Sequence, residues 1–412
     1  MASTVVVGAG IIGVAVAYEL QRRGKQVTLL DRSAPGSGAS FGNMASIAVT
    51  EFMPASRPGI FAQMPKWMLD PEGPVRVRPT YMIKLIPWFL RFLSASRPSR
   101  LRELEAAGAT LCRRVHEDLD ALLKETGLRH MLSANGCLSL YADEAEFRAD
   151  REHMEVLERF GFRHEILGAN AIRDLEPAVT TTIGKAVLFP DNRSVADPYR
   201  FVVALADKFR LLGGLIEEGE VVEFDHGEKG VVGLRLADGR RLPVSEIVLA
   251  AGAYTGRLSA RLKEYIPLET ERGYHTQIMD PGISMRHSII WPARAFMVTP
   301  TAGGIRVGGT VEMAGLDAPP DYRRAEVLVK RARQALPELQ LRQTTQWMGH
   351  RPALPDTIPV MGPSAKRNNV WYATGHGHLG LTYAATTGRL MADLITGVEP
   401  PVDMKPYRVD RF

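Results

Sequence analysis

TVVVGAGIIGVAVAYELQRRGKQVTLLDR, residues 4–32, is the stretch that decides the fold. The β-branched run Thr4–Val7 predicts a buried parallel strand. The apolar segment Ile11–Arg23, closed by Gly24, predicts a helix. A second strand is expected over Gln26–Leu30, directly before Asp31. Strand, glycine turn, helix, strand and acid in this order are typical of a Rossmann-like dinucleotide-binding unit.

The residues of the glycine turn have separate expected roles. Gly8 permits the tight turn, Gly10 lets the backbone approach a diphosphate, and Gly13 lets the helix pack close to the sheet. Ile12 lies at the start of the helix, where unpaired N–H groups attract phosphate. Asp31 is expected to accept hydrogen bonds from ribose hydroxyls, which favours FAD or NAD over a cofactor that carries a 2′-phosphate.

A second turn of small residues follows Asp31 and is expected to continue the nucleotide site. It contains Arg32 and the run Ser40-Phe41-Gly42-Asn43-Met44. Ser40, Asn43 and Met44 are expected to approach the diphosphate or the redox-active ring. Composition alone does not decide between FAD and NAD at this point.

Composition narrows the classes of function. The chain has 412 residues, 24% of them charged, with a net charge of +5, and these values are typical of a soluble protein with two domains. The small excess of positive charge argues against nucleic acid as the partner. Cys112 and Cys137 have neither metal-ligand nor disulfide-framework spacing, so we expect no metal. The first residues lack a convincing signal peptide, and we expect a cytoplasmic location.

Several later segments, in the expected order, complete a resemblance to the D-amino-acid oxidase superfamily. They follow the glycine turn and the run GASFGNMA, and comprise residues 247–255 (IVLAAGAYT), 306–312 (RVGGTVE), 346–362 (QWMGHRPALPDTIPVMG) and 370–384 (VWYATGHGHLGLTYA). The most similar branches are the bacterial D-amino-acid dehydrogenases and the hydroxy-D-proline dehydrogenases. The resemblance implies FAD and not a nicotinamide. Because no cysteine follows Cys137, a cysteinyl flavin near the C-terminus is excluded, and noncovalent FAD is expected.

The resemblance also implies the fold class, an α/β protein of the D-amino-acid oxidase and glutathione-reductase type. A Rossmann-like FAD-binding domain over residues 1–50, 192–255 and 345–412 is expected to interleave with an α+β substrate-binding domain over 51–191 and 256–344. The sequence itself predicts a helix after the cap Asp197 and helices over Leu101–Thr126 and Glu144–Phe160. It predicts strands over Val187–Pro190, Gly214–Phe224, Val231–Leu236 and Glu246–Ala250, and a hairpin at Asp238-Gly239.

The resemblance also implies which further residues bind the cofactor. The turn before the helix Leu381–Ile395 is expected to reach the flavin ring through its backbone N–H groups, with either histidine touching the ring; its residues are Gly375, His376, Gly377, His378, Leu379 and Gly380. No further ligand lies near His376 and His378 to suggest a metal. Val222 is expected to contact the adenine through its backbone, and Ala251 and Gly252 are expected near the cofactor.

The expected catalytic residues are Arg351, Tyr274 and His275. Arg351 lies in Gly349-His350-Arg351-Pro352, which resembles the family's Gly-x-Arg-Pro. Its planar fork suits a substrate carboxylate, and it is also expected beside the cofactor. Five aromatic residues are candidates to cover the substrate. Tyr274 and His275 rank first, and the others are Tyr254, Trp291 and Phe296. Most of these could equally be core residues.

The segment Tyr81–Leu93 (YMIKLIPWFLRFL) is the least typical of the chain, because Lys84 and Arg91 are its only charges. Two interpretations stay open. One is a buried helix broken at Pro87, and the other is a segment that docks on the inner face of a membrane or on a partner subunit.

The predicted function is oxidative deamination of a small D-amino acid, D-proline or cis-4-hydroxy-D-proline included. The electrons are expected to pass to a non-oxygen acceptor, such as a quinone, an electron-transfer protein or a partner subunit. Three alternatives remain: an oxidase that uses oxygen, a 2-hydroxy-acid oxidoreductase of the same fold, and a non-catalytic flavoprotein subunit of a larger assembly.

Overall fold

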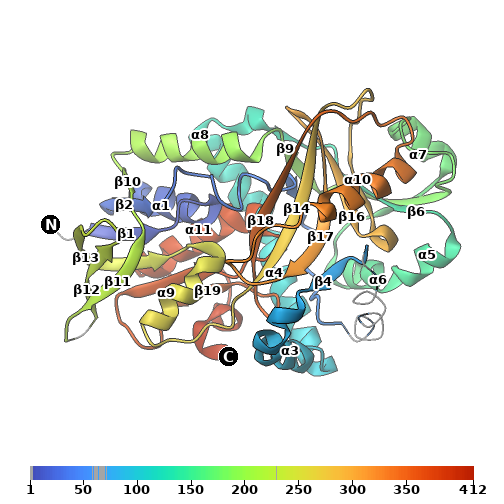
Figure 1. The fold of residues 1–412 in the computed structure, drawn as a ribbon. Coiled ribbons are helices and arrows are strands. Elements are labelled where there is room, and N and C mark those ends of the chain that lie inside the picture. Colours follow the sequence, from blue (N-terminus) through green and yellow to red (C-terminus); the bar gives the residue numbers. More distant parts are fainter. Residues whose placement is uncertain (1–2, 58, 60–63, 65–69, 71, 229) are drawn as a thin grey trace.

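The computed structural model describes residues 3–57, 59, 64, 70, 72–228 and 230–412 (Figure 1). Two large sheets lie side by side in these residues, each with its own helices and its own buried core. The chain passes between the two halves repeatedly, so neither half is a single continuous stretch of sequence.

The first sheet has eight strands in the described residues. Five of them run parallel in the order β10–β2–β1–β13–β20, while β12 and β11 continue from β13 as an antiparallel meander and β19 pairs with β20. Their bounds are β1 (Ser3–Val7), β2 (Val27–Asp31), β10 (Leu215–Glu218), β11 (Val221–His226), β12 (Val231–Leu236), β13 (Arg241–Leu249), β19 (Val360–Pro363) and β20 (Val370–Thr374).

Helices cover this sheet and place its loops. They are α1 (Ile11–Arg22), α4 (Pro98–Thr126), α8 (Pro198–Leu211), α9 (Thr255–Arg261) and α11 (Gly380–Thr396). Helix α1 packs against both α8 and α11, which explains why every one of its residues except Arg22 is buried. A Cβ on Gly388 of α11 would lie 2.8 Å from the carbonyl oxygen of Ala15, so this glycine permits the close helix contact.

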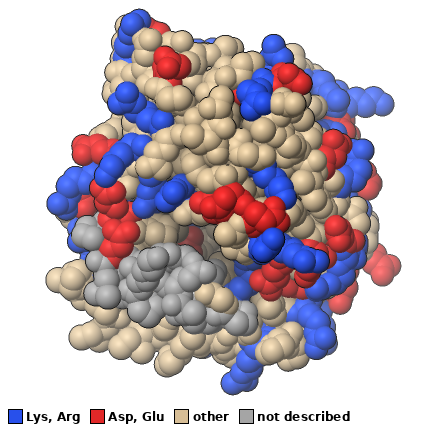
Figure 2. Space-filling view, turned by 90° about the vertical axis from the view of Figure 1, so that its right-hand side faces the viewer, with Lys and Arg blue, Asp and Glu red and all other residues tan. Residues whose placement is uncertain are grey.

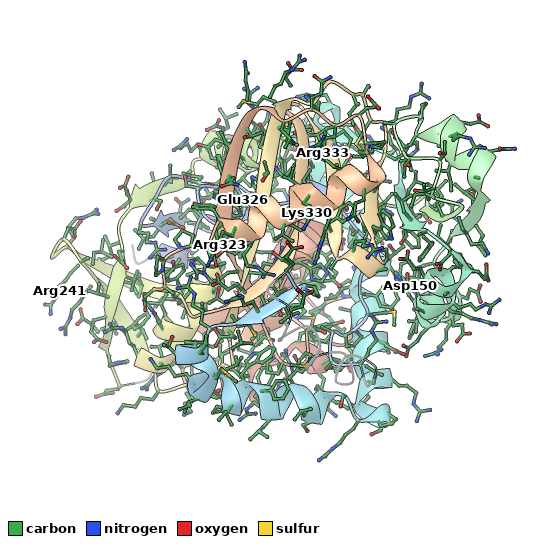
Figure 3. The ribbon with its side chains drawn as sticks, turned by 45° about the vertical axis from the view of Figure 1, so that its right-hand side comes forward. Asp150, Arg241, Arg323, Glu326, Lys330 and Arg333 are labelled. Carbon is green, nitrogen blue, oxygen red and sulfur yellow. The ribbon has the colours of Figure 1, made fainter. Side chains whose placement is uncertain are left out.

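The second sheet has nine strands in the described part of the chain, in the order β18–β14–β17–β16–β15–β6–β8–β7, with β4 paired to β17. Helix α10 (Arg323–Ala335) covers β14, β16 and β17 and carries charged side chains outward, four of which Figure 3 labels. The strand bounds are β4 (Val75–Val77), β6 (Cys137–Tyr141), β7 (Glu165–Gly168), β8 (Lys185–Phe189), β14 (Glu269–Asp280), β15 (Ser288–Trp291), β16 (Phe296–Thr301), β17 (Gly304–Met313) and β18 (Arg342–Ala353).

Short elements complete the fold. A small sheet joins β3 (Ser46–Ile47), β9 (Arg193–Val195) and β5 (Leu132–Ser133). The other helices are α3 (Met82–Ala95), α5 (Glu144–Ala149), α6 (Arg151–Phe160) and α7 (Ala169–Leu175). Single 3₁₀ turns lie at η1 (Pro79–Tyr81), η2 (Arg129–Met131), η3 (Gly252–Tyr254), η4 (Pro292–Arg294), η5 (Lys405–Tyr407) and η6 (Val409–Arg411).

Most of the predicted elements are confirmed. The side chain of Asp197 accepts a hydrogen bond from the N–H of Arg200 and caps α8, with Pro198 in the first helical position. The hairpin at Asp238-Gly239 joins β12 to β13. Two predictions were wrong in detail. The expected strand Gly214–Phe224 is two strands, interrupted at Gly219-Glu220, and the expected helix Glu144–Phe160 is interrupted at Asp150.

The domain ranges stay a prediction, and one strand crosses a proposed boundary. Strand β18 begins before residue 345 and pairs with β14 along its whole length, so its residues belong to the second sheet. The chain then enters the first sheet at β19.

The expected break at Pro87 was wrong. Helix α3 continues through this proline. A proline inside a helix leaves the carbonyl four residues earlier without its N–H partner. That carbonyl belongs to Ile83, whose side chain is largely exposed, so water can hydrogen-bond to it. Among the described residues no helix has the length and apolar content needed to cross a bilayer.

Candidate active site

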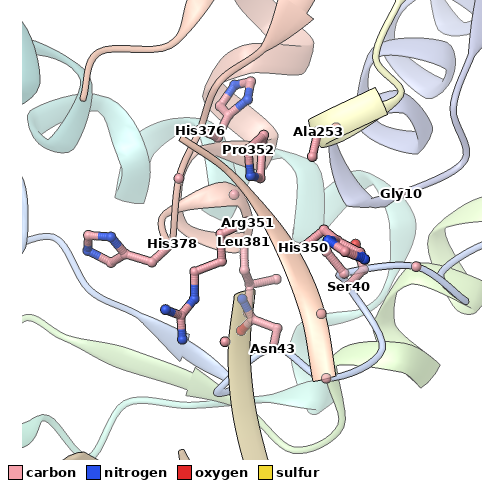
Figure 4. A pocket seen from close by; sticks show the side chains of 18 of the residues that line it. Gly10, Ser40, Asn43, Ala253, His350, Arg351, Pro352, His376, His378 and Leu381 are labelled. Atoms are coloured by element: carbon pink, nitrogen blue, oxygen red, sulfur yellow. The ribbon is translucent and has the colours of Figure 1, made fainter. Parts of the chain in front are cut away.

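A cavity of about 1290 Å³ runs between the two sheets. It extends from the glycine turn after β1, along the loop after β2, to the N-terminus of α11 and the inner face of β14 and β18 (Figure 4). It exceeds the ~300–1,000 Å³ typical of small-ligand pockets, as a site for a dinucleotide plus a substrate should.

The glycine turn brings backbone, and no side chains, to one end of the cavity. Gly8 has φ +112°, and a Cβ there would lie 2.4 Å from the carbonyl oxygen of Ala250. A Cβ on Gly13 would lie 1.8 Å from the carbonyl oxygen of Gly8, so only glycine allows α1 to start this close to the strand end. Gly13 therefore acts through packing and does not line the cavity.

Asp31 and Ser40 hold this turn in place. The carboxylate of Asp31 accepts hydrogen bonds from the N–H groups of Ala9, at 2.6 Å, and Ser33, at 2.9 Å. Burial raises the pKa of Asp31, and these hydrogen bonds oppose the rise. The hydroxyl of Ser40 accepts from the N–H of Ile11 at 3.0 Å, across the start of α1. These hydrogen bonds hold the turn that follows β2 against the glycine turn that follows β1.

The residues expected at the adenine and along the cofactor lie on one wall of the cavity. Val222, Ala251 and Gly252 all line it. The guanidinium of Arg32 lies 3.9 Å from the centre of the Tyr254 ring and 3.8 Å from a carboxylate oxygen of Glu220.

The turn before α11 forms the opposite end. His376, Gly377, His378, Leu379 and Gly380 line the cavity. Leu379 is the N-cap of α11 and offers no side-chain cap, so the helix presents free N–H groups and the positive end of its dipole. Gly375, with φ +81°, shapes the turn without lining the cavity, since Leu354 occupies the place of its Cβ.

The histidines of the site are held neutral. Burial lowers the pKa of His376 and of His275 to about 3, and that of His350 and His378 to about 4. The Nε2 atom of His376 lies 3.0 Å from the hydroxyl of Thr387, and the Nδ1 atom of His275 lies 3.0 Å from the carbonyl oxygen of Gly42. Among the described residues no group of His, Cys, Asp and Glu has a metal-binding arrangement.

The inner face of β14 and β18 forms a floor on which the central pair of residues carries no side chain of its own. In the antiparallel register His275 pairs with Trp347, Gly273 with Gly349, and Glu271 with Arg351. The rings of His275 and Trp347 stack with their centres 5.2 Å apart. The central pair, Gly273 and Gly349, leaves a gap in this row, and the Trp347 ring fills the half over Gly349, where a Cβ would lie 1.9 Å from it.

Arg351 leans into this gap. A Cβ on Gly273 would lie 2.3 Å from its Nη2 atom, so the guanidinium occupies the space that the glycine leaves free. Its Nη1 donates to the carbonyl oxygen of Thr310 at 3.0 Å, the one hydrogen bond of this side chain to the described residues. Burial lowers the pKa of Arg351, and the nearby Glu271 opposes this. Figure 4 shows Arg351 reaching into the cavity, with His378 coming from another element.

Thr310 adopts an unfavourable backbone conformation at this point. Its φ is +53°, rare for a β-branched residue, and it follows Gly309 with φ +151°. Such strain is concentrated at functional sites. Its consequence here is that the Thr310 carbonyl is available to Arg351.

Tyr274 and His275 are adjacent in sequence but face opposite sides of the sheet. The Tyr274 hydroxyl donates to Glu312 and accepts from the N–H of Asp321 at 2.9 Å. Glu312 also binds Arg272 at 3.1 Å and Arg78 at 2.7 Å. Tyr274 reaches the cavity wall, but its hydroxyl is bound within this buried network and does not face Arg351.

The remaining aromatic candidates lie in two places, the core of the second sheet and the cavity wall. Trp291 and Phe296 belong to the core of the second sheet, and the Trp291 N–H donates to Glu146 at 2.8 Å. Tyr254 lines the cavity under the guanidinium of Arg32. Trp347, which the sequence analysis did not select, lines the cavity beside Phe41 and His275. The alternation of Trp347, Gly349 and Arg351 along one strand was the available signal.

The neutral histidines generate a prediction about pH. The folded-state pKa of His376 lies below the unfolded value of about 6.5. The unfolded chain therefore binds more protons below that pH, and stability falls as the pH drops from about 6.5. At pH 5 one such histidine costs about 2 kcal/mol. His376→Gln should remove that share of the loss between pH 7 and pH 5, measured by urea unfolding of the FAD-free protein.

The exposed His226, substituted in the same way, is the matched control and should leave the pH dependence unchanged. Equal losses of stability in wild type and His376→Gln would show that His376 is not held neutral.

Comparisons with known proteins agree with this architecture. A family described as FAD dependent oxidoreductase (DAO) matches residues 3–394. The chain is 31% identical to a D-amino-acid oxidase of Bradyrhizobium diazoefficiens and 32% identical to a D-amino acid dehydrogenase of Xanthobacter autotrophicus, covering 99% of this chain and 98% of each relative.

Solved structures share the fold. Glycine oxidase from Geobacillus kaustophilus has a TM-score of 0.78 at 21% identity, covering 100% of this chain and 99% of that one. L-proline dehydrogenase from P. horikoshii has a TM-score of 0.76 at 21% identity, covering 100% and 97%. With the family match over nearly the whole chain, these findings show that the protein is an enzyme of the DAO family of FAD-dependent oxidoreductases.

Proposed function

We propose that this enzyme oxidatively deaminates a small D-amino acid, with D-proline and cis-4-hydroxy-D-proline as preferred candidates. The observation that carries the proposal is the half-buried Arg351 guanidinium, which lies over Gly273 beside the Trp347 ring in a cavity large enough for a dinucleotide. Two full-length relatives named for D-amino-acid oxidation support the substrate class.

The residues present fit FAD. Gly8, Gly10 and the start of α1 would hold the diphosphate, because a side chain at Gly8 would collide with backbone and the helix terminus favours anions. Asp31 would hold the ribose, and the turn His376–Gly380 would hold the ring. Cys112 and Cys137 are buried and neither lines the cavity, which supports noncovalent binding.

FAD, when bound, supplies the acceptor for the hydride that leaves the substrate Cα. Arg351 would orient the substrate. Its planar guanidinium can take both carboxylate oxygens of an amino acid, which fixes the Cα beside the carboxylate. The remaining N–H groups are available, because the Thr310 carbonyl takes only one.

The walls of the gap then limit what else fits. Trp347 and His275 form an apolar, uncharged wall beside Arg351, since the Trp347 ring covers Gly349 and the guanidinium covers the paired Gly273. Such a wall favours compact or ring-shaped side chains and excludes water from the reacting carbon. The free N–H groups at the start of α11 favour negative charge at their end of the cavity.

We further propose that electrons pass to a non-oxygen acceptor and that the enzyme works in the cytoplasm at the inner face of the membrane. The relative named a dehydrogenase supports the first part. The relative named an oxidase keeps oxygen as the competing acceptor. On the face shown in Figure 2, basic and acidic side chains are interspersed, without a basic stripe of the kind that binds nucleic acid.

Arg351→Ala tests the role of the guanidinium. Leaving a desolvated charge without its partner costs about 3–5 kcal/mol, so kcat/KM for the D-amino acid should fall about 10²- to 10⁴-fold. FAD content, read from the visible spectrum, should remain. Arg351→Lys should restore little of the lost kcat/KM, because the lysine ammonium cannot bind both carboxylate oxygens with two parallel N–H groups.

Arg342→Ala is the control, since Arg342 lies on the same strand, is largely exposed, and pairs only with Asp280 at 3.4 Å among the described residues. Unchanged kinetics in Arg351→Ala would remove this residue from substrate binding.

Gly273→Ala tests the gap itself. The new methyl group would meet the guanidinium, the mobile end of a side chain, so the protein should fold while Arg351 is displaced. We expect KM to rise about tenfold or more, equivalent to about 1.4 kcal/mol, with FAD retained. Gly168→Ala is the control, because nothing lies within 4 Å of a Cβ at that position. A wild-type KM would show that the guanidinium position does not depend on Gly273.

Dye reduction and oxygen consumption, measured on one preparation, test which electron acceptor the enzyme uses. We expect reduction of a soluble redox dye to exceed oxygen consumption at least tenfold with the best D-amino acid. Rapid oxygen consumption with peroxide release and little dye reduction would instead identify an oxidase.

A further inference from the structure

Helix α3 has two apolar faces, and only one of them is covered. Leu85, Trp88 and Phe92 are buried and pack against Met313 and Ala353, at the ends of β17 and β18. Met82, Ile83, Ile86, Leu90 and Leu93 are exposed, Ile83 to 81% and Leu90 to 60%.

The exposed residues form a single stripe. At 100° per residue, these five side chains fall within an arc of about 100°, and the buried ones lie on roughly the opposite side of the helix. The stripe therefore points directly away from the protein. In Figures 1 and 3 α3 runs along one edge of the molecule, with no labelled element beyond it.

The charges around the stripe have one sign. Residues 73–102 contain seven basic residues and no acidic one. Lys84, Arg91, Arg97 and Arg102 are exposed and form no ion pair with the described residues. Lys84 and Arg91 lie on the flank of α3, between its two apolar faces.

An exposed aromatic residue lies beside the helix. Tyr265, 60% exposed, has its ring centre 5.5 Å from the guanidinium of Arg91. Apolar side chains outermost, with cations and an aromatic ring at their margin, match the layers of a bilayer interface, where acyl chains lie below phosphate headgroups.

We propose that the outer face of α3 binds the surface of an anionic lipid bilayer. The stripe Met82, Ile83, Ile86, Leu90 and Leu93 enters the acyl layer, while Lys84, Arg91 and Arg97 contact the headgroup phosphates. A second copy of the chain fits less well. A symmetric contact through α3 would bring the cations of both copies together with no acidic residue in the segment to balance them.

This proposal does not rest on the identity of the substrate. The stripe faces away from the cavity, and none of its residues lines it. Binding to lipid and turnover with a soluble dye are therefore separate readouts of the same holoenzyme.

The test is co-sedimentation of the FAD-loaded enzyme with phosphatidylcholine vesicles, with and without roughly one third phosphatidylglycerol. We expect at least tenfold tighter binding to the anionic vesicles, weakened by about 0.5 M salt through screening. Ile83→Glu/Leu90→Glu and, separately, Lys84→Glu/Arg91→Glu should each reduce this binding at least tenfold. Turnover with dye should be unchanged.

Leu211→Glu is the matched control, because Leu211 is a leucine on α8 exposed to 78% and far from α3 in sequence. It should bind vesicles as the wild type does. Absence of binding to anionic vesicles, or equal binding by wild type and both double variants, would overturn the proposal. So would a dimer in solution that Ile83→Glu/Leu90→Glu dissociates while vesicle binding is absent, which would identify a second copy as the occupant.

Discussion

The antiparallel pairing of β14 with β18 is the constraint on which the site depends. It places Gly273 opposite Gly349 and so opens a gap in an otherwise continuous row of side chains. Arg351 lies over one glycine, while Trp347 stacks on His275 at the other end. A slip of one residue would turn all of these side chains to the opposite face. Because β18 leads directly to β19, the same pairing fixes the second sheet against the cofactor side of the cavity.

This packing also determines where positive charge lies in the cavity. Arg306 beside His275 and Arg351 beside His378 add to the effect of desolvation in lowering the pKa of these two histidines, so neither adds a charge that would compete for a carboxylate. Positive potential comes instead from Arg351 and from the N-termini of α1 and α11. Under the proposed function, the substrate carboxylate and the FAD diphosphate would have separate cationic partners at different places in one cavity.

The parts predicted correctly from the sequence are those set by local chemistry. The glycine turn, the Asp197 cap and the Asp238-Gly239 hairpin each depend on a few neighbouring residues. Which face of β14 and β18 meets the cavity could not be predicted, since it depends on pairing across some 70 residues. The alternation along each strand could have been used, and it separates Tyr274 from His275 and groups Trp347 with Arg351. Pro87 shows the same limit, because whether a proline breaks a helix depends on which carbonyl faces water.

A crystal structure of the FAD complex with an unreactive aromatic carboxylate would test the central claim most directly. The account predicts that the carboxylate binds the guanidinium of Arg351 above Gly273, with its ring against Trp347. A carboxylate bound elsewhere in the cavity, with Arg351 still held only by the Thr310 carbonyl, would contradict it.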